Sequence, residues 1–159
     1  MGNTIRDTDR GAKRLLKALK AKPASILVGV QGKEAVEPHE ESPLLTVGDI
    51  ATFSELGLGQ PERSWLRDWV DANKPMIEED LRKVMRKVIL LEMTAEQGIQ
   101  LLGVKYVGLI QTRIASGIAP PNAESTIARK ESSTPLIASG QFRSAITFTL
   151  EKLLQGMGT

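Results

Sequence analysis

The side chains that most often carry out catalysis are scarce in this sequence. His39 is the only histidine, and it lies beside proline and glutamate residues, where an exposed bystander is a more ordinary role than a general base. The chain has no cysteine, which excludes thiolate nucleophiles, thiolate metal sites and disulfides. No serine has a candidate base. We therefore predict that the protein is not an enzyme and has no catalytic residues.

The spacing of acidic residues and glycines also speaks against metal and nucleotide binding. The acidic run at 78–80 occupies three consecutive positions, which radiate around a helix and cannot converge on one ion. Acidic residues at the start of a helix are explained by the helix dipole instead. The glycines that could cradle a phosphate do not have the required spacing; they are Gly29, Gly32, Gly57 and Gly59. The sequence thus predicts no metal site and no cofactor.

The segment 51–67 contains three residues suited to a protein interface: Glu55, Arg63 and Arg67. Pro61 is predicted to open a short helix, because its fixed φ and missing N–H fit a first helical turn. Arg63 and Arg67 would then share an exposed face, with Trp65 or Leu66 buried on another. Arginine pairs well with carboxylates and is enriched at protein contacts. An intramolecular Glu55–Arg63 pair bracing the glycine turn explains the same residues equally well.

A second candidate surface is a basic helix predicted over residues 9–21. Its apolar residues form one thin stripe, at Ala12, Leu15, Leu16 and Leu19. The basic residues around the stripe are Arg10, Lys13, Arg14, Lys17 and Lys20. They could contact phosphates without reading a base sequence, since no aromatic side chain lies among them for stacking. A face toward a protein partner, or toward solvent, remains open as the alternative.

Charge is distributed in three blocks along the chain. The 159 residues carry a net charge of only +2. Residues 1–30 contribute +5, residues 31–80 contribute −8 and residues 81–159 contribute +5. Complementary patches of this kind can orient the association of copies of one subunit, although solvated surfaces are the plainer interpretation. No apolar signal segment or membrane-length run is present, so we expect the protein to be made in the cytoplasm and not to enter a membrane.

The predicted elements describe a single α+β domain over residues 1–159. Two longer helices, at about 75–93 and 95–116, are expected to pack on a small sheet of strands 25–31 and 144–151. A third helix is favoured at 47–56, with a strand at 50–54 as the alternative; Thr46 and Asp49 would form its capping box. Three glycines lie in the 95–116 helix: Gly98, Gly103 and Gly108. They suggest close approach of another backbone, with close helix contact favoured, and a merely tolerated loss of helix propensity is the alternative.

Three segments are predicted to lack regular structure. They are an acidic mobile loop at 33–45, an extended arm at 118–139 and a C-terminal tail at 151–159. In the arm, polar contacts would come from Thr126 and Lys130, and an apolar anchor from Leu136 and Ile137. Such an arm could wrap a neighbouring subunit, or it could dock on its own domain.

Two blocks of sequence resemble the virion-morphogenesis proteins of tailed bacteriophages, which join head to tail in the neck. The first is the 51–67 segment, with Glu55, Gly57, Pro61 and Arg63 followed by an aromatic residue, Leu66 and Arg67. The second runs from Pro120-Pro121 through Thr126 and Lys130 to Pro135-Leu136-Ile137 and Gly140. It departs from the family at Ala138-Ser139, where Asp or Thr often precedes the glycine. The resemblance covers residues 46–148.

The resemblance implies a structural protein of the virion neck. Its expected partners are further copies of itself in a ring of six or twelve, the adjoining neck and tail proteins, and DNA that passes through the ring unread. The interface candidates would be Glu55, Arg63, Arg67, Thr126, Lys130, Pro135, Leu136 and Ile137. A different class of function stays open: a free cytoplasmic protein that binds DNA or assists assembly through its basic first helix.

Overall fold

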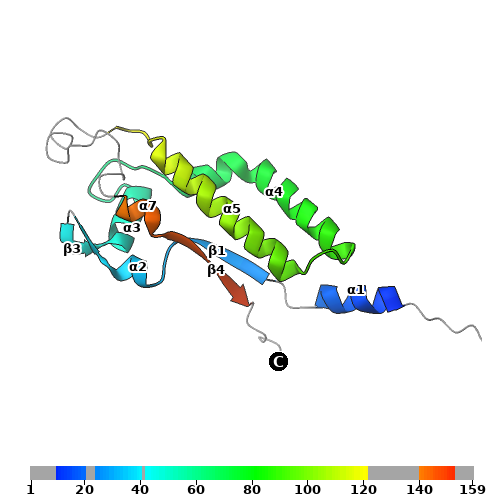
Figure 1. The fold of residues 1–159 in the computed structure, drawn as a ribbon. Coiled ribbons are helices and arrows are strands. Elements are labelled where there is room, and N and C mark those ends of the chain that lie inside the picture. The colour runs from blue at the N-terminus through cyan, green and yellow to red at the C-terminus, as the bar shows by residue number, and fades with distance from the viewer. Residues whose placement is uncertain (1–9, 21–23, 41, 122–139, 153–159) are drawn as a thin grey trace, which may run out of the picture.

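The computed structural model describes residues 10–20, 24–40, 42–121 and 140–152, which form a single α+β domain (Figure 1). The predicted fold class is therefore confirmed. The elements follow the order α1 (Arg10–Lys20), β1 (Ala24–Val30), α2 (Lys33–Val36), β2 (Pro38–His39), β3 (Ser42–Thr46), α3 (Val47–Leu56), α4 (Arg67–Ile89), α5 (Ala95–Ala115), α7 (Gln141–Ser144) and β4 (Ile146–Lys152).

The main sheet joins the two ends of the described chain. Strands β1 and β4 pair antiparallel, with Val28 opposite Phe148 and Ala24 opposite Lys152. The side chains of β1 alternate between the two faces of the sheet, as the sequence predicts. Ile26, Val28 and Val30 pack against the core, while Leu27 on the other face is half exposed. The strands end close to their predicted bounds, except that Lys152, expected in the tail, belongs to β4. The rest of the predicted tail lies outside the described residues.

Helix α5 is the central element of the domain. It packs on both strands of the sheet and, along another side, on α4 (Figure 1). The predicted close helix contact is found at Gly98, where an added Cβ would lie 2.3 Å from Val84 in α4. At Gly103 an added Cβ would lie 2.5 Å from the Phe148 ring in β4, so both neighbours are side chains and not the predicted backbone. Gly108 has nothing within 4 Å of such a Cβ, so there the prediction was wrong.

The prediction that both long helices pack on the sheet was half right, because only α5 lies directly on it. Helix α4 packs on α5 instead. It also begins at Arg67, eight residues before the predicted start, and continues through Pro75 without ending. The helix ends at Ile89, before the predicted end at about residue 93.

Local capping signals place the starts of α3 and α5 correctly. Thr46 accepts a hydrogen bond from Asp49 N at 3.1 Å while the Asp49 carboxylate accepts from Thr46 N at 2.9 Å. The Asp49 carboxylate also accepts from Thr46 Oγ1 at 2.7 Å, and its bonds from the Thr46 amide and hydroxyl hold the pKa of Asp49 below its usual value. Thr94 and Gln97 form the same reciprocal pair at the start of α5. Each box satisfies amides that have no partner within the helix.

The predicted loop at 33–45 contains regular structure. Helix α2 and the β2–β3 hairpin lie within it, and His39 is buried rather than exposed. The side chain of Gln141 in α7 explains the order: its Nε2 donates to Pro38 O and its Oε1 accepts from Glu40 N. The hairpin is thus fixed by a residue about a hundred positions away, which local polarity in the sequence does not reveal.

The core gathers side chains from α3, α4, α5, α7 and the sheet. Trp65 and Phe142 meet edge to face with ring centroids 5.2 Å apart, and Trp69 lies 5.7 Å from Tyr106. Phe142 is 2% exposed, so the four-residue helix α7 is a core element although the sequence did not predict it as a helix. The expected burial of Trp65 is confirmed. Packing of this density lets a chain without disulfides form a stable core.

Candidate assembly interface

The connection between α3 and α4 does not contain the predicted short helix. Gly57 ends α3 in the left-handed conformation at φ 68°, and Leu58 N donates to Phe53 O across the turn. Residues 61–64 have no helical structure, and the helix begins only at Arg67. Arg63 and Arg67 therefore do not share a helix face. Proline at 61 fits an irregular connection as well as a helix start, so it did not distinguish the two.

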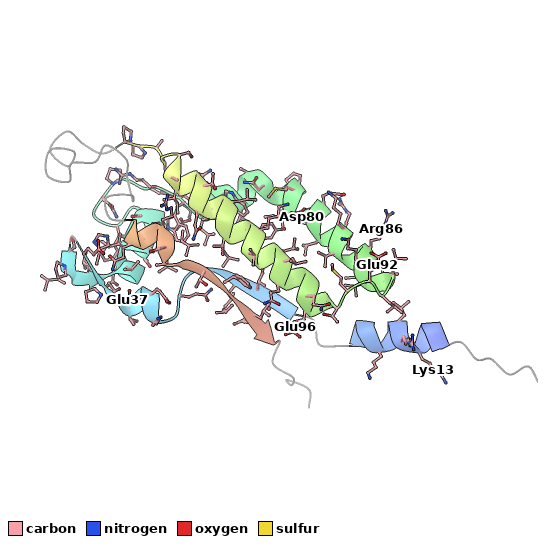
Figure 2. The ribbon with its side chains drawn as sticks, viewed as in Figure 1. Lys13, Glu37, Asp80, Arg86, Glu92 and Glu96 are labelled. Carbon is pink, nitrogen blue, oxygen red and sulfur yellow. The ribbon has the colours of Figure 1, made fainter. Side chains whose placement is uncertain are left out.

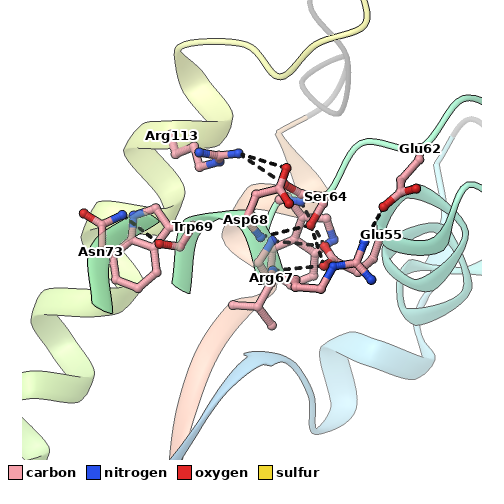
Figure 3. Close-up of polar contacts among 10 residues, drawn as sticks. Glu55, Glu62, Ser64, Arg67, Asp68, Trp69, Asn73 and Arg113 are labelled. Atoms are coloured by element: carbon pink, nitrogen blue, oxygen red, sulfur yellow. Dashed lines mark hydrogen bonds and ion pairs between the residues drawn. The ribbon is translucent and has the colours of Figure 1, made fainter. Parts of the chain in front are cut away.

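Glu55 caps the start of α4 from the end of α3. Its Oε1 accepts from Arg67 N at 2.9 Å, and its Oε2 accepts from Trp65 N and Leu66 N at 2.9 and 3.0 Å (Figure 3). The first amides of a helix lack partners within it and carry the positive end of the helix dipole, so a carboxylate is well placed there. Glu55 thus braces the turn through the backbone amides of residues 65–67, whereas the prediction named Arg63 as its partner.

Ser64 and Arg113 extend this network, and the sequence analysis missed both. The Ser64 hydroxyl donates to Glu55 Oε1 at 2.9 Å and accepts from Asp68 N at 3.1 Å. Arg113 Nη2, from α5, donates to Ser64 O at 3.3 Å and lies 3.9 Å from the Asp68 carboxylate (Figure 3). A serine immediately before an apolar residue, here Trp65, is a recognisable helix-start signal, and it could have placed the start of α4 close to residue 67.

Arg63 is buried, which corrects its predicted exposure. Its side chain is 6% exposed in the structure, and it donates from Nε to Pro120 O at 2.8 Å and from Nη2 to Pro121 O at 3.3 Å. Burial lowers the pKa of the Arg63 guanidinium. Arg63 therefore fastens the segment that follows α5 to the α3–α4 connection. It is a structural residue and not a surface that a partner could reach.

Arg67 stays available at the surface. Its guanidinium pairs with Glu62, and both side chains are about half exposed. An exposed pair of this kind contributes little to stability, so a partner carboxylate could displace Glu62 at small cost. Of the three interface candidates in this segment, Arg67 alone combines charge with access.

The predicted arm lies almost entirely outside the described residues. Thr126, Lys130, Pro135, Leu136 and Ile137 all fall there. The described beginning of this segment is held in place, because Ile118 is buried and Pro120 and Pro121 accept the bonds from Arg63.

Basic α1 and the glutamates around β2 lie at opposite ends of the domain, and exposed Glu92 and Glu96 lie at the α1 end as well (Figure 2). Lys13, Arg14 and Lys17 are exposed on α1, which contacts the rest of the domain through α4. Arg10 and Lys20 belong to the same helix. Exposed Glu37 lies at the far end, beside β2 (Figure 2), and exposed Glu40 directly follows β2 in the chain. The domain thus has a basic helix at one end and exposed glutamates around β2 at the other.

The described residues contain no cluster of histidine and acidic side chains able to hold a metal ion. The most strongly shifted group is Tyr106, whose burial and whose contact with Asp80, at 3.4 Å between the hydroxyl and Oδ2, raise its pKa to about 12. Lys105 Nζ also lies 2.6 Å from Asp80 Oδ2, which makes this an α4–α5 contact.

Neither a family model, nor a curated protein, nor a solved structure matches this chain. Within the described parts of the chain, no helix combines the length and the apolar character needed to cross a bilayer.

Proposed function

We propose that this protein is a structural subunit of the neck of a tailed bacteriophage, where a ring of six or twelve copies joins head to tail around the DNA channel. The observation that carries the proposal is the placement of two surfaces at opposite ends of one domain. One is basic α1, and the other is the β2–β3 hairpin with exposed Glu37 and Glu40. A ring needs two different, complementary patches on every subunit. The two sequence blocks at 51–67 and 120–140 add the family resemblance.

The described residues of the candidate interface favour a structural role for the protein. Glu55, Ser64 and Arg63 are engaged in holding α3, α4 and the end of α5 together. Arg67 and the α1 cations remain for partners: the next copy of the chain, the adjoining neck and tail proteins, and the phosphates of DNA in the channel. The protein would pass from the host cytoplasm into the virion.

Depletion of this protein during phage assembly is the direct test. We expect filled heads and complete tails to accumulate unjoined, and joining to be restored by the purified protein. Class averages of assembled necks should contain a ring built from this chain. Necks that form normally without it, or whose averages contain no such ring, would overturn the proposal.

A second candidate function rests on α1 alone. Exposed Lys13, Arg14 and Lys17 could bind DNA without sequence recognition in a protein that never enters the virion. Light scattering coupled to size-exclusion chromatography, with and without duplex DNA, separates the two functions. Salt-sensitive binding of DNA by a monomer, together with its absence from purified particles, would favour this second function.

A further inference from the structure

Helix α1 is an amphipathic helix that contacts α4 of its own domain but keeps most of its described side chains exposed. Of the α1 side chains that the structure describes, none belongs to the buried core, and Leu16 remains 54% exposed. The helix carries five basic residues and no acidic one. A surface that covers it must therefore offer both apolar contact and negative charge.

The opposite end of the same domain has both properties. Val36, at the end of α2, is 71% exposed, and Leu44 in β3 is 99% exposed. Glu37 and Glu40 flank β2 with exposed side chains. The β2–β3 hairpin is held by Gln141, so these residues are presented on a fixed element. We call this surface the acidic end.

We propose that α1 of one copy docks on the acidic end of the next copy, with Leu16 against Val36 and Leu44 and the α1 cations facing Glu37 and Glu40. This assignment rests on the proposed ring and specifies how its subunits are joined. The two surfaces lie at opposite ends of the domain, so one chain cannot satisfy both by itself (Figure 1). Repeating such a head-to-tail contact builds a ring or an open filament.

Charge and apolarity together favour a protein partner over the other surfaces that attract basic helices. DNA would neutralise the cations but leave Leu16 uncovered. An anionic membrane would cover both, yet it requires a surface that the neck of a virion does not provide. The acidic end supplies complementary groups on the chain itself, and it is present at the same concentration as α1.

Disulfide trapping tests the contact directly, because the chain contains no cysteine. A Leu16→Cys variant mixed with a Leu44→Cys variant should form the mixed disulfide at least about tenfold faster than Leu16→Cys mixed with Leu101→Cys. Leu101 is a matched control, since it is apolar and 61% exposed but lies on α5. Equal rates for the two mixtures would overturn the proposal, even when association is weak.

Charge exchange provides the second test. Lys13→Glu/Lys17→Glu and Glu37→Lys/Glu40→Lys should each weaken self-association by about tenfold, and mixing the two variants should restore it between them. Lys74→Glu/Lys87→Glu carries the same charge change on α4 and should have little effect. Association that is insensitive to the first two pairs, or mixtures that fail to restore it, would reject the docking.

The outcomes also separate this docking from the neck proposal. Rings in particles whose residues 16 and 44 do not cross-link would remove the docking and leave the neck function. Rapid trapping between 16 and 44, together with necks that lack the protein, would leave the docking and remove the neck function. DNA or anionic vesicles that prevent the disulfide between positions 16 and 44 from forming, by competing for α1, would assign the helix to those surfaces instead.

Discussion

Two arginines four residues apart have opposite roles because they differ in burial. Arg63 is enclosed and bonded to the carbonyls of Pro120 and Pro121, whereas Arg67 lies at the surface beside Glu62. A charge reversal at the first leaves a buried carboxylate facing carbonyl oxygens. The same change at the second leaves an exposed carboxylate near another one.

We expect Arg63→Glu to lower the free energy of unfolding by roughly 3–5 kcal/mol and Arg67→Glu to change it by less than about 1 kcal/mol. Chemical unfolding followed by the fluorescence of the two buried tryptophans would measure both. Arg67→Glu should instead impair incorporation into particles. Equal loss of stability in both variants would show that Arg67 is structural as well.

Tyr106 should titrate unusually late. Burial of the hydroxyl, the larger cause, and the nearby Asp80 carboxylate together raise the pKa of Tyr106 from 10.0 to about 12. The group is the only tyrosine, so the ultraviolet absorbance of phenolate reports it directly. Between pH 10 and 12 the unfolded chain loses this proton while the folded one keeps it. Stability should therefore fall by up to about 1.4 kcal/mol per pH unit over this window, and not below it.

The Tyr106→Phe variant is the control for that titration. It removes the ionisation and keeps the ring that packs on Trp69. Its stability should fall less steeply above pH 10 than that of the parent protein. A phenolate midpoint near 10 in the folded protein would contradict the assigned contact with Asp80.

At the scale of elements, the glycines of α5 should respond oppositely to alanine. Gly108 faces open space, so Gly108→Ala should stabilise the protein by about 1 kcal/mol through helix propensity. Gly103→Ala would place a methyl group 2.5 Å from Phe148, and it should cost roughly 1–3 kcal/mol. Urea unfolding of the two variants checks the contrast. A stabilising change at 103 would mean that α5 and β4 are less closely packed.

The cap on α4 should depend on Glu55 more than on any side chain of α4 itself. Leu66, at the N-cap, provides no side-chain bond, while Glu55 accepts from three consecutive amides. We expect Glu55→Ala to cost roughly 1–3 kcal/mol and Glu55→Gln less, because the amide oxygen still accepts. Amide exchange at residues 65–67 should quicken in the alanine variant. Unchanged exchange there would argue against the cap.

Whether a helix is capped by its own neighbouring residues or by a distant element explains which elements the sequence could predict. Helices α3 and α5 begin at capping boxes whose partners are three residues apart, and both starts were predicted. The start of α4 was not, because its cap comes from another helix. Helix α7 and the β2–β3 hairpin were missed for a related reason: Phe142 and Gln141 stabilise them through distant contacts.

The candidate site followed the same rule. Glu55 was identified from its residue type and position, whereas the burial of Arg63 depends on residues 120 and 121, nearly sixty positions away. Exposure of the α1 cations could be predicted, since a thin apolar stripe buries little of a helix. The position of α1 relative to the acidic end could not be predicted from the sequence, because it depends on the whole fold.

At the scale of the whole molecule, separated charge makes association dependent on ionic strength. We expect self-association to weaken as salt rises from about 0.05 M to about 0.5 M, because exposed charges are screened beyond the Debye length. Light scattering on the wild-type protein and on the Lys13→Glu/Lys17→Glu variant would measure this. The variant should show a shallower dependence, and an equal one would place the relevant charges elsewhere.

The pairing of β1 with β4 also sets the time at which the protein can become functional. The side chain of Gln31 reaches Thr147 O across 116 residues, and the same two strands cover one side of α5. A chain still on the ribosome has made β1, α4 and α5 but not the strand that places Phe148 against Gly103. The sheet can close only after β4 has been synthesised, so the pairing of β1 with β4 is a late step of folding. In the proposed ring, a subunit would therefore be added only after its own β4 has paired with β1.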